Sequence, residues 1–224
     1  VAMDSADAWA NPSLFQLDEK NVPYAVAGCP PDGFSATGQL WGNPLYRWEY
    51  HRQTGYEWWL KRLSHCFKLY DAVRIDHFRG FDQYYSIPYG AEDATRGHWE
   101  QGPGIDLFNR VRQVLGEKEV IAEDLGYVTD SVRKLVYDSG FPGMKVLEFA
   151  FDSRDSGCAN DYLPHNYPEN SVAYTGTHDR LPIEMRMNMK LWQAGLTALQ
   201  KKNRIWYVII CVIITLQRNI YISL

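Results

Sequence analysis

The sequence predicts an α/β fold, in which helices and short strands alternate along the chain as they do in part of a (β/α)₈ barrel. Two observations favour this class. Stretches with apolar residues at helical spacing alternate with short β-branched runs, which indicates βα units around a parallel sheet. Three of these runs end in an acidic residue, and in a (β/α)₈ barrel the carboxyl ends of the strands form the active-site edge.

The composition fits a globular protein with one sizeable core. The chain has 224 residues, of which 46% are hydrophobic, and this is enough for one large domain. The net charge is −4 and both signs are interspersed, so no basic patch would attract nucleic acid. Motifs for nucleotide binding, zinc proteolysis, serine hydrolysis and EF-hand calcium binding are absent from the sequence.

The first helix and strand are expected after a long stretch of loops. Residues 1–45 are rich in Pro, Gly, Asn and Asp and carry little periodicity, which is typical of loops with short turns. Residues 56–70 place apolar side chains on one face at helical spacing. Residues 72–76 follow as a strand, whose period of two puts Arg74 and Asp76 on the same face.

The same order of elements recurs further along the chain. A second helix and strand are followed by a third helix, which Thr129 can cap, and by two more strands. The expected elements are a helix over 105–115, a strand over 119–122, a helix over 129–138, a strand over 144–151 and a strand over 172–177.

The acids that end these strands form a candidate catalytic set, which is Asp76, Glu123 or its neighbour Asp124, and Asp179. Cleavage of a glycosidic bond needs one carboxylate at the anomeric carbon and a second, protonated carboxyl at the leaving oxygen. Arg74 would keep the Asp76 carboxylate ionised, as a nucleophile requires, and Glu123 would need a raised pKa to act as the acid. Taken singly, each acid is better explained by helix capping or arginine pairing, but the set as a whole favours catalysis.

Three further side chains are candidate substrate contacts. His77 and His178 could each donate a hydrogen bond to a sugar hydroxyl or serve the structure alone. Trp41 lies in a Gly/Pro-rich segment where a large ring has little core to fill, so stacking on a sugar explains it at least as well as hydrophobic anchoring. Core packing is expected for most of the aromatic set Phe78, Phe81, Tyr84 and Tyr85.

Three runs in the sequence resemble those of amylomaltases, the 4-α-glucanotransferases also called disproportionating enzymes. These runs are RIDHFRG at 74–80, IAEDLG at 121–126 and YTGTHD at 174–179. The resemblance extends over residues 1–179 in the same order and spacing. It also includes the segments 4–12, 30–35, 41–46, 142–147 and 163–167.

The resemblance implies an enzyme that moves a segment of an α-1,4-glucan to the 4-hydroxyl of an acceptor glucan or glucose through a covalent glycosyl-enzyme. Its partners would be maltooligosaccharides and α-1,4-glucans, with no metal or organic cofactor. The roles it implies are nucleophile for Asp76, acid/base for Glu123, transition-state stabiliser for Asp179, and substrate contact for Arg74, His77 and His178. The segment with Asp32 and Trp41 would cover the cleft and exclude water, which favours transfer over hydrolysis. A related α-glucan hydrolase and a non-catalytic glucan-binding fragment are the alternatives.

The resemblance also divides the chain into two parts. Residues 1–179 are expected to be a partial catalytic barrel of the glycosidase type, truncated at both ends relative to the family and inactive by itself. Residues 180–224 match nothing in the family and are interpreted as an alternative or mispredicted 3′ exon, or a translated intron, of an incomplete gene model. A membrane anchor is the rival interpretation of the apolar run 205–216, whose 12 residues are fewer than the roughly 17–25 that span a bilayer. We expect an intracellular protein, plastidial in a photosynthetic eukaryote and otherwise cytoplasmic.

Overall fold

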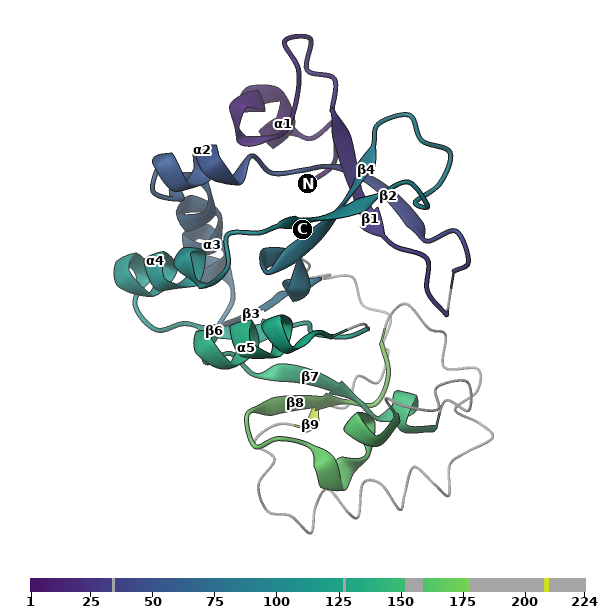
Figure 1. The fold of residues 1–224 in the computed structure, drawn as a ribbon. Helices are drawn as coiled ribbons and strands as arrows, with labels where there is room; N and C mark the ends of the chain where they lie inside the picture. Colours follow the sequence, from purple (N-terminus) through teal and green to yellow (C-terminus); the bar gives the residue numbers. More distant parts are fainter. Residues whose placement is uncertain (34, 127, 152–158, 178–207, 210–224) are drawn as a thin grey trace.

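The computed structural model describes residues 1–33, 35–126, 128–151, 159–177 and 208–209. Within them the chain forms a parallel sheet, an antiparallel sheet and helices that pack beside both (Figure 1). The helices are α1 (Ala6–Ala10), η1 (Pro12–Leu14), α2 (Trp48–Gln53), α3 (Glu57–Leu69), η2 (Phe78–Phe81), α4 (Ile105–Leu115), α5 (Asp130–Ser139), η3 (Leu147–Phe151), η4 (Ala159–Tyr162) and η5 (Pro164–Asn166). The strands are β1 (Ala25–Cys29), β2 (Gln39–Pro44), β3 (Ala72–Ile75), β4 (Gln83–Pro88), β5 (His98–Gln101), β6 (Glu119–Ala122), β7 (Gly143–Val146), β8 (Ser171–Tyr174) and β9 (Val208–Ile209).

The parallel sheet confirms the α/β class that the sequence predicts. Its strands lie in the order β3-β6-β7-β8-β9, which is their order along the chain. Residues of β3 and β6 pair one to one, with Arg74 opposite Ile121 and Ile75 opposite Ala122. Because all the strands point the same way, the residues that follow β3 and β6 meet at one edge of the sheet.

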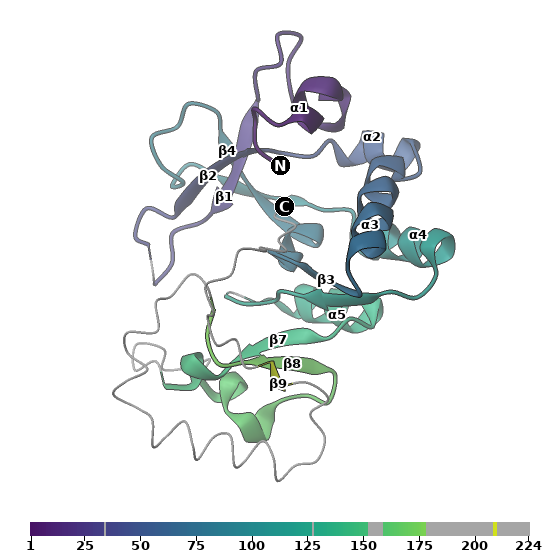
Figure 2. The same ribbon diagram turned by 180° about the vertical axis from the view of Figure 1, so that it is seen from behind.

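The three long helices form where the amphipathic patterns predict them. In α3, Trp59 and Leu63 are buried, and α3, α4 and α5 lie along one side of the parallel strands in both views (Figures 1 and 2). The side chain of Thr129 accepts the N–H of Val132, as expected for an N-cap, and Gly140 ends α5 in the left-handed conformation. The start of α5 is therefore encoded locally, whereas α3 and α4 begin without a side-chain cap. The apolar face of each helix decides where it packs.

The antiparallel sheet shows that the loop expectation for residues 1–45 is wrong in part. Its strands lie in the order β2-β1-β4-β5, and they join residues 25–29 and 39–44 to residues 83–88. Strands β4 and β5 and the short helix η2 are inserted between β3 and α4, directly after Asp76. The antiparallel sheet is consequently attached at the edge of the parallel sheet where the acids lie.

Two of the later strands are shorter than the sequence predicts. The strand expected over 144–151 becomes the 3₁₀-helix η3 at Leu147, and the one expected over 172–177 ends at Tyr174. The described residues do not include His178 or Asp179. Of the expected tail 180–224, they include only 208–209. The division at residue 179 and the interpretation of the tail stay predictions. Of the helices in the described part, none is both long and apolar enough to cross a bilayer.

The main core is an aromatic cluster between η2 and the helices. The rings of Phe78 and Phe108 stack with centroids 4.9 Å apart, and the rings of Trp59 and Phe81 meet edge to face at 5.4 Å. Phe78 and Phe81 are completely buried and Tyr85 is nearly so, which confirms the core role expected for most of this set. Rigid packing directly after Asp76 fixes the course of the chain out of β3.

Candidate active site

The edge of the parallel sheet brings Arg74 and Asp76 together as an ion pair. Nη2 of Arg74 donates to Oδ1 of Asp76 over 2.8 Å, and both side chains come from the same face at the end of β3. The Arg74 side chain is 16% exposed and that of Asp76 is 37% exposed. Asp76 therefore combines an ion-pair partner with access from solvent.

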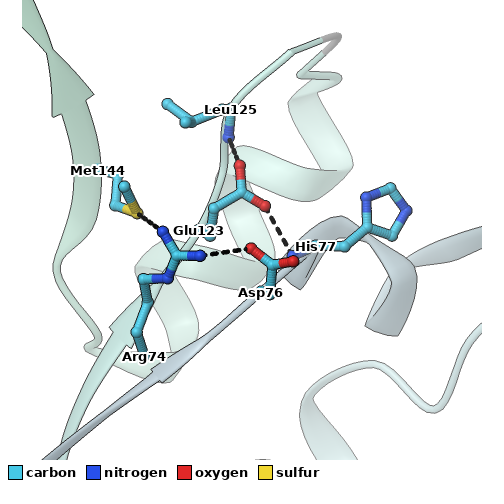
Figure 3. A network of polar contacts seen from close by, with 6 residues as sticks. All are labelled: Arg74, Asp76, His77, Glu123, Leu125 and Met144. Atoms are coloured by element: carbon cyan, nitrogen blue, oxygen red, sulfur yellow. Dashed lines mark hydrogen bonds and ion pairs between the residues drawn. The ribbon is translucent and has the colours of Figure 1, made fainter. Parts of the chain in front are cut away.

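Hydrogen bonds beyond the strand ends place Glu123 next to this pair. The N–H of Glu123 donates to the Ile75 carbonyl at 3.0 Å, and the N–H of Phe78 donates to the Glu123 carbonyl at 2.9 Å. Its side chain accepts two further backbone bonds, to Oε2 from the N–H of His77 at 2.7 Å and to Oε1 from the N–H of Leu125 at 2.9 Å. Figure 3 shows the Asp76 and Glu123 carboxyl groups near each other, directly after the neighbouring strands β3 and β6.

The two carboxyl groups differ in their electrostatic environment. Burial, and secondly the negative charge of Asp76, raise the pKa of Glu123 to about 7, although the two backbone N–H groups and Arg74 act in the opposite direction. Glu123 is thus partly protonated near neutral pH, while Asp76 is ion-paired with Arg74. One group that can donate a proton and one that can attack carbon are what retaining cleavage of a glycosidic bond requires.

His77 adopts a backbone conformation that serves this arrangement. Its φ of 49° and ψ of 50° are left-handed, which is uncommon for a residue with a side chain and costs free energy. Burial, and secondly the nearby Arg79 cation, lower the pKa of the imidazole to about 4. The ring is therefore neutral at neutral pH, so it can donate one hydrogen bond and accept another.

Trp41 lies on strand β2 and not in a loop, but it reaches the site. Its ring meets the His77 ring edge to face with centroids 4.8 Å apart, and 40% of the residue is exposed. Both rings line a small hollow together with Tyr84, Tyr85 and other residues of the antiparallel sheet. A partly exposed indole next to His77, the residue after Asp76, is suited to stacking on a sugar ring.

Asp32 lies in the turn that connects β1 and β2. Its Oδ1 accepts the N–H of Ser35 at 2.8 Å, and its own N–H donates to the Ser35 carbonyl at 3.0 Å. These bonds stabilise the turn, and the substrate contact expected of Asp32 stays a prediction. The same holds for His178 and Asp179, which lie outside the described residues.

Asp124 has a role that the sequence left open. Its Oδ1 accepts the N–H of Met144 at 2.8 Å, and burial raises its pKa. Asp124 is thus directed to strand β7, while Glu123 faces Asp76, so the register of β6 decides between the two acids. Among the described residues, no cluster of three or more metal-ligating side chains is present.

An ion-paired carboxylate beside a carboxyl of raised pKa, at the carboxyl edge of a parallel sheet, has the properties that retaining cleavage of a glycosidic bond requires of its two acids. The sequence profile described as 4-alpha-glucanotransferase matches residues 1–205 of the chain. The chain therefore belongs to the 4-alpha-glucanotransferase family.

Individual relatives agree with this membership. The 4-alpha-glucanotransferase of Streptococcus pneumoniae is 55% identical over 179 residues, which are 80% of this chain and 35% of the relative. That of Clostridium butyricum is 52% identical over 180 residues, or 80% of this chain and 36% of the relative. The solved amylomaltase of Streptococcus agalactiae, in complex with acarbose, superposes with a TM-score of 0.75 at 45% identity, over 80% of this chain and 36% of that one. The chain spans about a third of the length of these relatives.

Proposed function

We propose that the complete protein is a 4-α-glucanotransferase, which transfers segments of α-1,4-glucans to the 4-hydroxyl of an acceptor glucan or glucose. The observation that carries the proposal is the pairing of ion-paired Asp76 with Glu123, whose pKa is raised to about 7. Family membership and the complex of the related amylomaltase with acarbose support maltooligosaccharides as substrates. The parallel strands, in chain order with acids at their carboxyl edge, support a (β/α)₈ barrel of the glycosidase type in the complete protein.

The reaction follows from the two carboxyl groups as a retaining double displacement. Asp76 attacks the anomeric carbon, and Glu123 transfers its proton to the leaving oxygen as the glycosidic bond breaks. Glu123, now ionised, then takes the proton from the 4-hydroxyl of the acceptor, which attacks the anomeric carbon and releases Asp76. Arg74 and the neutral His77 ring would contact the substrate, and Asp179 would stabilise the transition state, as the family resemblance implies.

Transfer in place of hydrolysis requires that water is kept from the glycosyl-enzyme. Trp41 and the turn with Asp32 belong to the β1–β2 hairpin, and Trp41 already contacts His77 at the site. A sugar stacked on the indole would occupy the space from which water would otherwise attack. An intracellular location, plastidial in a photosynthetic eukaryote and otherwise cytoplasmic, is part of the same proposal.

Incubation of the complete protein with maltotriose tests the activity. Transfer yields glucose together with maltooligosaccharides longer than the substrate, and chromatography separates these products. Asp76→Asn should reduce the rate by at least about 10³-fold, as loss of a nucleophile does. Shortening without elongation would identify a hydrolase, and full activity of the Asn variant would refute the assignment of Asp76.

A further inference from the structure

Met144 contacts the catalytic ion pair, and the reaction steps above give it no role. The residue is 1% exposed, and its sulfur atom Sδ accepts a hydrogen bond from Nη1 of Arg74 at 3.8 Å. The other terminal nitrogen of the same guanidinium, Nη2, donates to Asp76 at 2.8 Å. One guanidinium thus contacts a thioether on one strand and the carboxylate on another (Figure 3).

The geometry of the guanidinium makes these two contacts interdependent. Arg74 belongs to β3 and Met144 to β7, and β6 lies between these strands, so the Arg74 side chain extends across the face of β6. A guanidinium is planar and its donors point in fixed directions. An acceptor that fixes the direction of Nη1 therefore also fixes the direction of Nη2.

Met144 is itself held relative to the acid. Its backbone N–H donates to Oδ1 of Asp124 at 2.8 Å, and Asp124 directly follows Glu123. The start of β7 fits closely against this carboxylate, because a Cβ added at Gly143 would lie 2.7 Å from Oδ2 of Asp124. The contact between Met144 and Arg74 thereby connects the Arg74–Asp76 ion pair to the segment that carries Glu123.

We propose that Met144 is a positioning residue, whose thioether sulfur holds the Arg74 guanidinium in the orientation that presents Nη2 to Asp76. The role rests on the proposed function, because orientation of Asp76 matters to the rate only if this carboxylate is the nucleophile. A sulfur atom is suited to this position because it is a weak, uncharged acceptor. It directs the guanidinium without competing with Asp76 for its charge.

Met144→Leu in the complete enzyme removes the acceptor and keeps an apolar side chain of similar volume. We expect kcat for maltotriose to fall by about tenfold while KM changes by less than about twofold, as for other residues that orient a catalytic group. Met144→Gln supplies a neutral oxygen acceptor and should restore kcat to within about threefold of wild type. Leu147→Met is the matched control, since it makes the reverse exchange at a position 2% exposed directly after the same strand, and it should leave kcat unchanged.

A double-mutant cycle with Arg74→Lys separates positioning from general packing. Lysine lacks the planar fork, so Met144→Leu should lower kcat by less than about twofold in that background. Independent, multiplicative effects of the two substitutions would overturn the proposal, as would a wild-type kcat for Met144→Leu. If the Met144→Leu variant does not fold, the Met144→Gln variant tests the proposal instead. A large loss of kcat in the Gln variant, with the Tm of wild type, would contradict the role of the sulfur as a hydrogen-bond acceptor.

A crystal structure of Met144→Leu gives a result that does not depend on activity. We expect the Nη2–Oδ1 bond between Arg74 and Asp76 to be lost, and its retention at 2.8 Å would refute the inference. A wild-type enzyme that does not elongate maltotriose would refute the proposed function alone, whatever the orientation of Arg74. Elongation by wild type together with an intact ion pair in the Leu variant would refute only the role of Met144.

Discussion

The backbone N–H of His77 donates a 2.7 Å hydrogen bond to Oε2 of Glu123, so the residue after the proposed nucleophile holds the proposed acid. His77 itself adopts a left-handed conformation, with φ at 49°. The backbone that carries Asp76 therefore helps to set both the position and the protonation of the Glu123 carboxyl group. The local folding of residues 75–78 is thus part of the catalytic arrangement.

Substitution of His77 by Gly and by Ala tests this conformation. Both variants lose the imidazole, so both should lose its substrate contact, but only Gly adopts a left-handed conformation without strain. We expect His77→Gly to be more stable than His77→Ala by roughly 0.5–1 kcal/mol, after allowance for the greater flexibility of unfolded Gly. Urea unfolding of the two variants measures the difference, and an Ala variant at least as stable as the Gly variant would contradict it.

Glu123→Gln tests the raised pKa of Glu123 through stability. The pKa of about 7 in the folded protein is above the ordinary value of 4.5, so the folded state binds more protons between these values. Wild-type stability should therefore fall as pH rises from about 4.5 to about 7. Between pH 4 and pH 8 the free energy of unfolding of the Gln variant, relative to wild type, should increase by about 3 kcal/mol.

The comparison across pH removes the constant cost of the substitution. Both carboxyl oxygens of Glu123 accept backbone N–H groups, whereas the amide nitrogen of Gln accepts none, so the variant carries a penalty at every pH. Chemical unfolding of both proteins at several pH values measures the change. A constant difference between the two curves would mean that Glu123 titrates alike in the folded and unfolded states.

His51 should make the protein sensitive to acid. Its ring is fully buried, its Nε2 donates to the Leu14 carbonyl at 3.0 Å, and burial lowers its pKa from 6.5 to about 4. The unfolded state then binds more protons between pH 4 and 6.5, so stability is lost as pH falls through this range, by about 3 kcal/mol in total. His51→Gln keeps a donor for Leu14 without a titrating group, and its unfolding free energy should depend less on pH by that amount. An unchanged acid dependence in this variant would exclude His51 as its source.

Trp41→Ala tests the role of the hollow beside His77. Loss of an aromatic stacking face should lower kcat/KM for maltotriose by about 3- to 10-fold, corresponding to about 0.5–1.5 kcal/mol. Trp41→Phe should retain most of the activity. Trp9→Ala is the control, because Trp9 is 83% exposed on α1. Equal effects of the two Ala substitutions would show that the loss is not specific to the site.

Much of the parallel sheet and the central part of the site could be predicted from the sequence. Periodicity locates α3, β3, α4 and β6 because each is encoded by residues close together in the chain. The shared face of Arg74 and Asp76 follows from the two-residue period of a strand, and the structure confirms it with their ion pair. Burial at this sheet edge raises the pKa of Glu123, as its proposed role as the acid requires.

The parts that could not be predicted depend on contacts between distant segments. Strand β1 pairs with β4 some 60 residues later, and neither run has a pattern that would identify its partner. Trp41 was expected in a loop for the same reason, since its strand exists only by pairing with β1. The contact of Met144 with Arg74 crosses an intervening strand and has no signal in the spacing of residues.

The most direct test of the proposed mechanism uses Glu123→Gln in the complete enzyme with an α-maltotriosyl fluoride donor. Fluoride leaves without protonation, so the nucleophile can still react, whereas release of the glycosyl group lacks its base and the covalent intermediate should accumulate. Peptide mass spectrometry after proteolysis then locates the attached sugar. We expect the maltotriosyl group on Asp76, and its attachment to any other residue would contradict the assignment of Asp76 as the nucleophile.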